Sequence, residues 1–192
     1  MPHDSQTPPS TDNYAIGKGV LYISNYVSGQ SPSWSEMGNC PSIEVEPMVE
    51  RTPHYSSQSG YKTKDKNPAT STDYTVNFDC DEIATANLRK YLMGTTGSHS
   101  HEIYALQAAD EEYALKFVSD NPTGPNFTWI FHRCTIQSNG AMALIGEDWM
   151  AMSFTAEGLS DSTNNASSPY FDVEGHTTTT TSTSSSTSST TN

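Results

Sequence analysis

Strict alternation of apolar and polar residues over residues 73–80 is the feature that most constrains how this chain can fold. In the segment DYTVNFDC, the residues Tyr74, Val76, Phe78 and Cys80 fall on one face, and Asp, Thr and Asn lie between them. Side chains of a β-strand alternate between the two faces of a sheet. The pattern therefore predicts a strand with one buried and one exposed face, and a fold built around at least one half-buried sheet.

Most other apolar segments have the period or the β-rich composition of strands. They are GVLYISNYV (19–27), SIEVEPMVE (42–50), EIYALQA (102–108), EYALKFV (112–118), NFTWIFHRCTIQ (126–137), AMALI (141–145) and WMAMSFTAEGL (149–159). Pro47 interrupts the second segment, so we expect that strand at a sheet edge or at a bend. Asn139 and Gly140 form a dipeptide typical of a two-residue hairpin, so the strands on either side are expected to pair.

One segment has helical spacing. In DEIATANLRKYLMG, Ala84, Leu88, Tyr91 and Leu92 recur at intervals that place them on one helix face. We expect a helix over 82–93, with Asp81 as N-cap and Gly94 at C′. Together the patterns predict a mainly β fold, a β-sandwich or rolled barrel of about seven or eight strands with one flanking α-helix.

Composition divides the chain into three parts. Residues 1–13 read as a flexible N-terminal arm, residues 14–161 as one β domain, and residues 162–192 as an extended tail rich in Ser and Thr. Within the β domain, residues 51–68 form a long polar loop. No apolar run approaches the length needed to span a bilayer, and the N-terminus lacks the features of a Sec signal, so no membrane insertion and a cytoplasmic origin are expected.

The formal net charge of −13 disfavours tight nucleic-acid binding, because such a chain cannot neutralise phosphates. The same charge would let the protein face nucleic acid as a repelling wall. The segment HYSSQSGYKTKDK (54–66) departs from this balance, since it contains three of the nine Lys and Arg residues. It is either a solvated excursion or a loop that contacts another molecule.

No pattern of catalytic or cofactor-binding residues is present in the sequence. His99 with His101, and His132 with Cys134, lack the partners that a zinc site needs, so no metal is expected. Nucleophile elbows, phosphate-binding loops and dinucleotide fingerprints are absent, so we expect no enzyme activity and no cofactor. The cysteines are expected to be reduced thiols packed as small hydrophobes; they are Cys40, Cys80 and Cys134.

Three stretches, in this order and spacing, resemble the major tail tube proteins of phages with long, non-contractile tails. They are GNCPSIEVEPMVERTPHYSSQSGYKTKDK (38–66), FDCDEIATANLRKYLMG (78–94) and TIQSNGAMALIGEDWMAMSFTAEGLSD (135–161). With IGKGVLYI near the start, the resemblance covers roughly residues 14–161. It implies the tail-tube fold, a β-sandwich with one helix, in which six subunits form a ring and rings stack into a tube.

The resemblance also implies partners and contacts. Double-stranded DNA would pass through the lumen without specific binding, and the tape-measure protein and the tail-tip and terminator proteins would be further partners. The protein would be located in the virion tail after assembly in the host cytoplasm. The loop would contact neighbouring subunits through His54, Tyr55, Ser56, Ser57, Gly60, Tyr61, Lys62, Lys64, Asp65 and Lys66.

Acidic residues in the second half of the chain could line such a lumen and keep DNA from adhering to it. The alternative is that they are solubility charges on an outer face. The candidates are Glu102, Asp110, Glu111, Glu112, Glu147 and Asp148.

Our leading hypothesis from the sequence is a structural virion protein that self-assembles into hexameric rings. One alternative is a related ring protein, such as a tail terminator or a secretion-system tube. A second alternative is a monomeric adhesin or carbohydrate-binding module with an aromatic ligand patch that uses Trp34 or Trp129.

Overall fold

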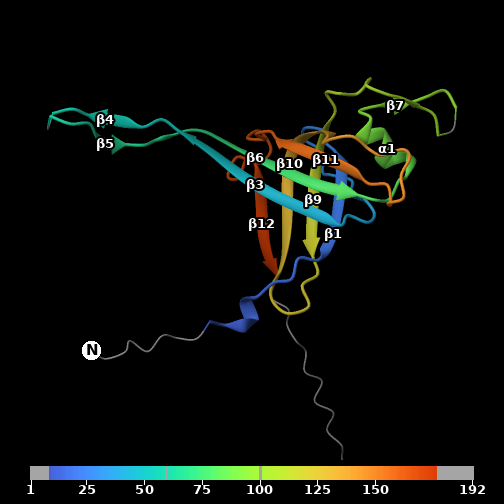
Figure 1. The fold of residues 1–192 in the computed structure, drawn as a ribbon, viewed down its shortest axis with the longest axis horizontal. Coiled ribbons are helices and arrows are strands. Elements are labelled where there is room, and N and C mark those ends of the chain that lie inside the picture. The colour runs from blue at the N-terminus through green and yellow to red at the C-terminus, as the bar shows by residue number, and fades with distance from the viewer. Residues whose placement is uncertain (1–8, 59, 100, 177–192) are drawn as a thin grey trace, which may run out of the picture.

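The computed structural model describes residues 9–58, 60–99 and 101–176, and these residues form a mainly β fold with one α-helix, as predicted. The main sheet is antiparallel (Figure 1). Its strands are β1 (Gly19–Asn25), β2 (Ser35–Glu36), β3 (Ser42–Arg51), β6 (Ala69–Cys80), β9 (Glu112–Ser119), β10 (Asn126–Ser138), β11 (Met152–Gly158) and β12 (Phe171–His176). Two small hairpins, β4 (His54–Ser56) with β5 (Thr63–Lys66) and β7 (Thr95–Thr96) with β8 (Ile103–Tyr104), stand apart from it.

The long strand β10 joins the two halves of the sheet. Along one side it pairs with β9, and the order continues to β1 and β2. Along the other side its first half pairs with β12 and its last residues pair with β11, from which the order continues to β6 and β3. The register shifts between Phe131 and Cys134, at the point where β10 changes partner. A shift of this kind bends a strand, so β10 can belong to both layers of a rolled sheet.

Aromatic side chains from both halves fill the core. Phe78 of β6 and Phe154 of β11 lie opposite each other and stack at 4.9 Å between ring centroids. Tyr74 packs 5.4 Å from both Phe131 and Phe171, and its hydroxyl donates a hydrogen bond to the carbonyl of Arg133 at 2.9 Å. The alternation predicted for residues 73–80 is confirmed, because the four apolar residues of that segment are buried.

The helix α1 (Thr85–Tyr91) lies within the predicted range but is shorter, and its predicted caps are wrong. Ala84 is the N-cap residue and makes no side-chain cap bond, while the Asp81 carboxylate accepts hydrogen bonds from the Asn39 amide. At the other end Met93, and not Gly94, takes the left-handed conformation, with φ of +47°. A Cβ on Gly94 would lie 2.7 Å from Ile103, so that glycine is required by close packing.

Two predicted strands are wrong or shortened, and the predicted hairpin at Asn139 is wrong. Residues 139–151 form a long loop between β10 and β11, without the strand expected at 141–145. The ends of this loop are held by backbone and side-chain bonds, from Asn139 N to the Ser153 carbonyl at 2.7 Å and from the Tyr91 hydroxyl to the Gly140 carbonyl at 2.8 Å. Of the strand expected at 102–108, only β8 forms.

The folded part extends beyond residue 161, where the sequence placed the start of the tail. β12 pairs with β10 from Asn126↔His176 to Phe131↔Phe171. Phe171 also joins the aromatic core, which explains why this segment is part of the sheet. The all-Ser/Thr stretch at 177–191 and the first eight residues lie outside the described residues. A short 3-10 helix (Thr11–Asn13) lies within the expected N-terminal arm.

Candidate assembly surfaces

The polar loop predicted at 51–68, here called the arm, forms a hairpin over its described residues 51–58 and 60–68. It continues from the ends of β3 and β6, and β4 pairs with β5 within it. Figure 1 shows it projecting from one end of the sheet, with α1 and β7 at the other end. Its base is closed by hydrogen bonds from Thr52 N to the Pro68 carbonyl and from Arg51 to the Asn67 carbonyl, both 3.2 Å. β3 is the last strand in the sheet order, which confirms the edge position expected from Pro47.

The arm presents its predicted contact residues to solvent. Tyr55 and Tyr61 are exposed, as are Lys62, Lys64 and Lys66 on the returning side. Within the arm His54 Nδ1 lies 2.6 Å from Asp65 Oδ1, and this hydrogen bond lowers the pKa of the Asp65 carboxyl. Of the predicted set only Ser56 is half-buried.

The arm is basic, whereas the rest of the chain is strongly acidic. Residues 51–68 contain four of the nine basic residues and one of the 22 acidic residues, a net charge of +3. The remaining residues therefore have a net charge of −16. Charges of opposite sign separated in this way favour head-to-tail contact between copies and disfavour contact between like ends.

The candidate lumen acids gather at the α1 end of the molecule, on three segments that contact the helix region. Glu102 lies in the β7–β8 hairpin, which Arg89 joins through a 3.1 Å bond to Thr96. The segment before β9 is held to the helix end by a 2.9 Å bond from Ala108 N to the Met93 carbonyl. The third segment is the 139–151 loop with Glu147 and Asp148, both exposed.

Three of these acids are engaged by side chains or backbone of their own chain, which makes them less available to line a lumen. Glu112 forms a bidentate ion pair with Arg133, at 2.8 and 2.6 Å, and both side chains are about two-thirds buried. Glu111 accepts a hydrogen bond from the Tyr113 hydroxyl. Glu102 accepts one from the His99 backbone N–H at 3.0 Å, which lowers the pKa of its carboxyl. Asp110, Glu147 and Asp148 are the exposed members of the set.

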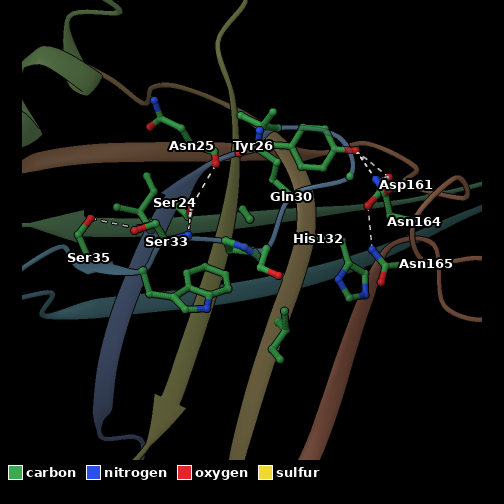
Figure 2. Close-up of a pocket in the computed structure, with 18 of the residues that line it drawn as sticks. Ser24, Asn25, Tyr26, Gln30, Ser33, Ser35, His132, Asp161, Asn164 and Asn165 are labelled. Atoms are coloured by element: carbon green, nitrogen blue, oxygen red, sulfur yellow. Dashed lines mark hydrogen bonds between the residues drawn. The ribbon is translucent and has the colours of Figure 1, made fainter.

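A polar cleft of about 990 Å³ lies between residues 26–34, the strands β1, β9 and β10, and the turn at 161–165 (Figure 2). Trp34 lines it, and so do Lys90 and His132. His132 is 9% exposed, and its Nε2 lies 3.3 Å from Asp172 without making a hydrogen bond. Burial lowers the pKa of the Lys90 amine. Trp34 was named from the sequence as a ligand-patch candidate and His132 only as a rejected zinc candidate. The cleft itself was not predicted, because the lining residues come from segments distant in sequence.

Asp161 organises one wall of the cleft. Its carboxylate accepts hydrogen bonds from the Tyr26 hydroxyl at 2.7 Å and from the side-chain amides of Asn164 and Asn165 at 2.8 Å each. Burial would raise the pKa of this carboxyl, but the three hydrogen bonds outweigh burial and hold the pKa below its ordinary value. The bonds tie the end of β1 to the turn that leads into β12.

Cysteines and histidines are the residues that were considered from the sequence as candidate metal ligands. The three cysteines are free thiols, and burial raises the pKa of Cys134. His99 lies beside Glu102, and His101 beside Thr85. Across the described ranges, no three His, Cys, Asp or Glu side chains are grouped to hold a metal ion. Among the described residues, no helix is long and apolar enough to cross a membrane.

Over the described residues, the fold and these surfaces define a class, a mainly β protein with one α-helix, a projecting basic arm, and exposed acids near the helix end. Residues 14–102 match a family described only as "protein of unknown function UCP028589". The match includes the arm and α1 but less than half of the chain. None of the curated proteins compared with the chain matches it.

Proposed function

We propose that this protein is a structural subunit of a phage tail tube, without catalytic activity. Copies associate into hexameric rings, rings stack, and the resulting acidic channel lets double-stranded DNA pass toward the host. The observation that carries the proposal is the arm, whose strands β4 and β5 pair as a hairpin and whose net charge of +3 contrasts with the net charge of −16 of the rest of the chain. An exposed hairpin of this length needs a partner to offset the free energy of ordering it.

Two further features support self-assembly. β3 ends the sheet order, so its outer backbone groups are available for pairing with another chain, and a closed ring would satisfy such an edge in every copy. Asp110, Glu147 and Asp148 are exposed acids, and a channel lined by such groups would repel DNA rather than bind it. Passage without binding is the behaviour that DNA ejection requires.

Negative-stain electron microscopy of the purified protein across concentration, with light scattering on the same samples, tests the proposal. We expect stacked six-fold rings or tubes with a central channel. The variant K62E/K64E/K66E should assemble poorly, whereas K18E, which changes an exposed lysine of the body, should assemble like the wild type. A protein that stays monomeric at every concentration, even when seeded with purified tail-tip complexes, would exclude the tube function.

The cleft favours one alternative, a carbohydrate-binding module. It combines the Trp34 ring with amide, hydroxyl and imidazole groups, a mixture suited to neutral sugars. Isothermal titration with a panel of neutral oligosaccharides distinguishes the two functions. A module would bind as a monomer and lose affinity in W34A, whereas a tail tube subunit would assemble and give no heat of sugar binding.

A further inference from the structure

The loop at 139–151 exposes large apolar side chains to solvent, which is unfavourable in a free monomer. Leu144, Ile145 and Trp149 are 75%, 97% and 96% exposed, respectively, and they lie within six residues of one another. Single exposed apolar residues are common on protein surfaces, but three in one loop, one of them tryptophan, are typical of an interaction surface. Glu147 and Asp148 lie between them, so this surface is both apolar and acidic.

The structure anchors the N-terminal end of this loop to the core. Met142 packs against the core, and the Asn139 and Gly140 backbone bonds anchor the same end. The apolar side chains beyond Met142 are therefore presented from a fixed base. A presented surface of this kind loses less conformational entropy on binding than a mobile loop does.

The arm has the complementary composition. It carries exposed Tyr55 and Tyr61 for apolar contact and Lys62, Lys64 and Lys66 for contact with acids. Lysine ammonium groups also bind the face of an indole ring, so Trp149 can interact with the same side chains. The loop has a net charge of −2 and the arm a net charge of +3, which makes the two surfaces electrostatically complementary.

The two surfaces of one chain cannot meet. β6 runs twelve residues from the arm base at Ala69 to Cys80, and Cys80 pairs with Met152, directly after the loop. A strand of that length spans roughly 40 Å, and the arm points away from the body. Any contact between arm and loop is therefore between two copies.

We propose that the arm of one copy docks on the 139–151 loop of the next, with Leu144, Ile145 and Trp149 as its apolar anchors. The inference rests on the proposed self-assembly and identifies the contact that carries it. Because the two patches differ, the contact is head-to-tail, and repetition of it closes a ring or extends a stack.

Two variants, each defective in only one of the two surfaces, test this contact directly. One variant, K62E/K64E/K66E, keeps the loop, and the other, L144S/I145S/W149S, keeps the arm. All of these side chains are exposed, so both variants should fold, and circular dichroism with urea unfolding checks this. Biolayer interferometry then measures each variant against itself and against the other.

We expect the unlike pair to bind at least ten-fold more tightly than either like pair, because only the unlike pair contains one intact arm and one intact loop. In the single-site control, K18E should bind like the wild type, since Lys18 lies in neither patch. Charge exchange gives a second test: E147K/D148K should recover binding to K62E/K64E/K66E.

Equal affinity in all pairings, or no preference for the unlike pair, would overturn the inference. If the wild type forms rings or tubes in that case, the tail tube proposal stands and only the contact is misassigned. If the unlike pair binds but no rings or tubes form under any condition, the contact is supported and the tube proposal fails.

Discussion

Replacing Asp161 tests whether the carboxylate holds β1 and the turn before β12 together. Asp161 is 3% exposed and accepts three side-chain hydrogen bonds, two on Oδ1 and one on Oδ2. Hydrogen bonds to a charged group contribute about 1.5–3 kcal/mol each, but bonds to one carboxylate are not additive. D161N keeps one acceptor oxygen and turns an amide toward the remaining donors, so we expect a loss of about 2 kcal/mol.

The matched control is D120N. Asp120 also makes a short ion pair, at 2.8 Å to Lys18, but the two side chains are 71% and 66% exposed. Exposed pairs contribute little because solvent screens them, so D120N should cost less than about 0.5 kcal/mol. Urea unfolding at pH 7, followed by circular dichroism, measures the free energies of unfolding of both variants and the wild type.

The pH dependence of the free energy of unfolding distinguishes the contribution of the Asp161 charge from that of its side-chain shape. Its folded pKa lies below the unfolded value of 3.8, so its contribution is complete above that pH and is lost as the pH falls through the folded pKa. The difference between wild type and D161N should therefore be constant from pH 7 to about 5 and should narrow below about 4. Equal losses in D161N and D120N, or a difference that does not change with pH, would refute the reasoning.

Three other substitutions give expected shifts in urea unfolding. Y74F should cost about 1 kcal/mol, because the Arg133 carbonyl loses its hydroxyl donor inside the core; a loss near zero would mean that water replaces the hydroxyl. M93G should stabilise by about 0.5–1 kcal/mol, because glycine adopts the left-handed φ of +47° without strain, and destabilisation would show that Met93 side-chain packing dominates. I145S should leave the free energy of unfolding within about 0.5 kcal/mol of the wild type, and a larger loss would show that the loop packs on its own chain.

Local patterns predicted the strands well where burial follows a strict alternation. The segment 73–80 and the segments that became β3 and β11 were identified from the period of their apolar residues, whereas those that became β1, β9 and β10 were identified from their β-rich composition and flanking turns. The helix was found by its spacing, but its caps were not. Leu92 and Met93 close it by backbone bonds to Leu88 and Lys90, and the basic residues Arg89 and Lys90 in the last turn indicate the end of the helix but not its exact cap residue.

The loop at 139–151 was predicted wrongly because a short apolar run is compatible with both a strand and a loop. AMALI contains strand-forming residues, and Asn139 with Gly140 is a strong turn signal. Only the partner strand decides whether such a run joins a sheet. Phe154 pairs with Ser138, so the sheet continues beyond the loop and leaves Leu144 and Ile145 outside it. Exposure of apolar side chains depends on this register and cannot be read from residue type.

The separation of charge explains how a chain of net charge −13 could associate with itself at all. Acidic bodies repel one another across tens of ångströms, whereas the lysines of an arm and Glu147 or Asp148 of a loop would attract within a few ångströms. Screening by about 0.1 M salt acts beyond roughly 10 Å, so it weakens the repulsion first and leaves the contact largely intact. Near 1 M the screening length falls to about 3 Å, and the contact weakens as well. Association through the arm should therefore strengthen as salt is first added and decline at high salt, and an arm without a charged partner would show no such maximum.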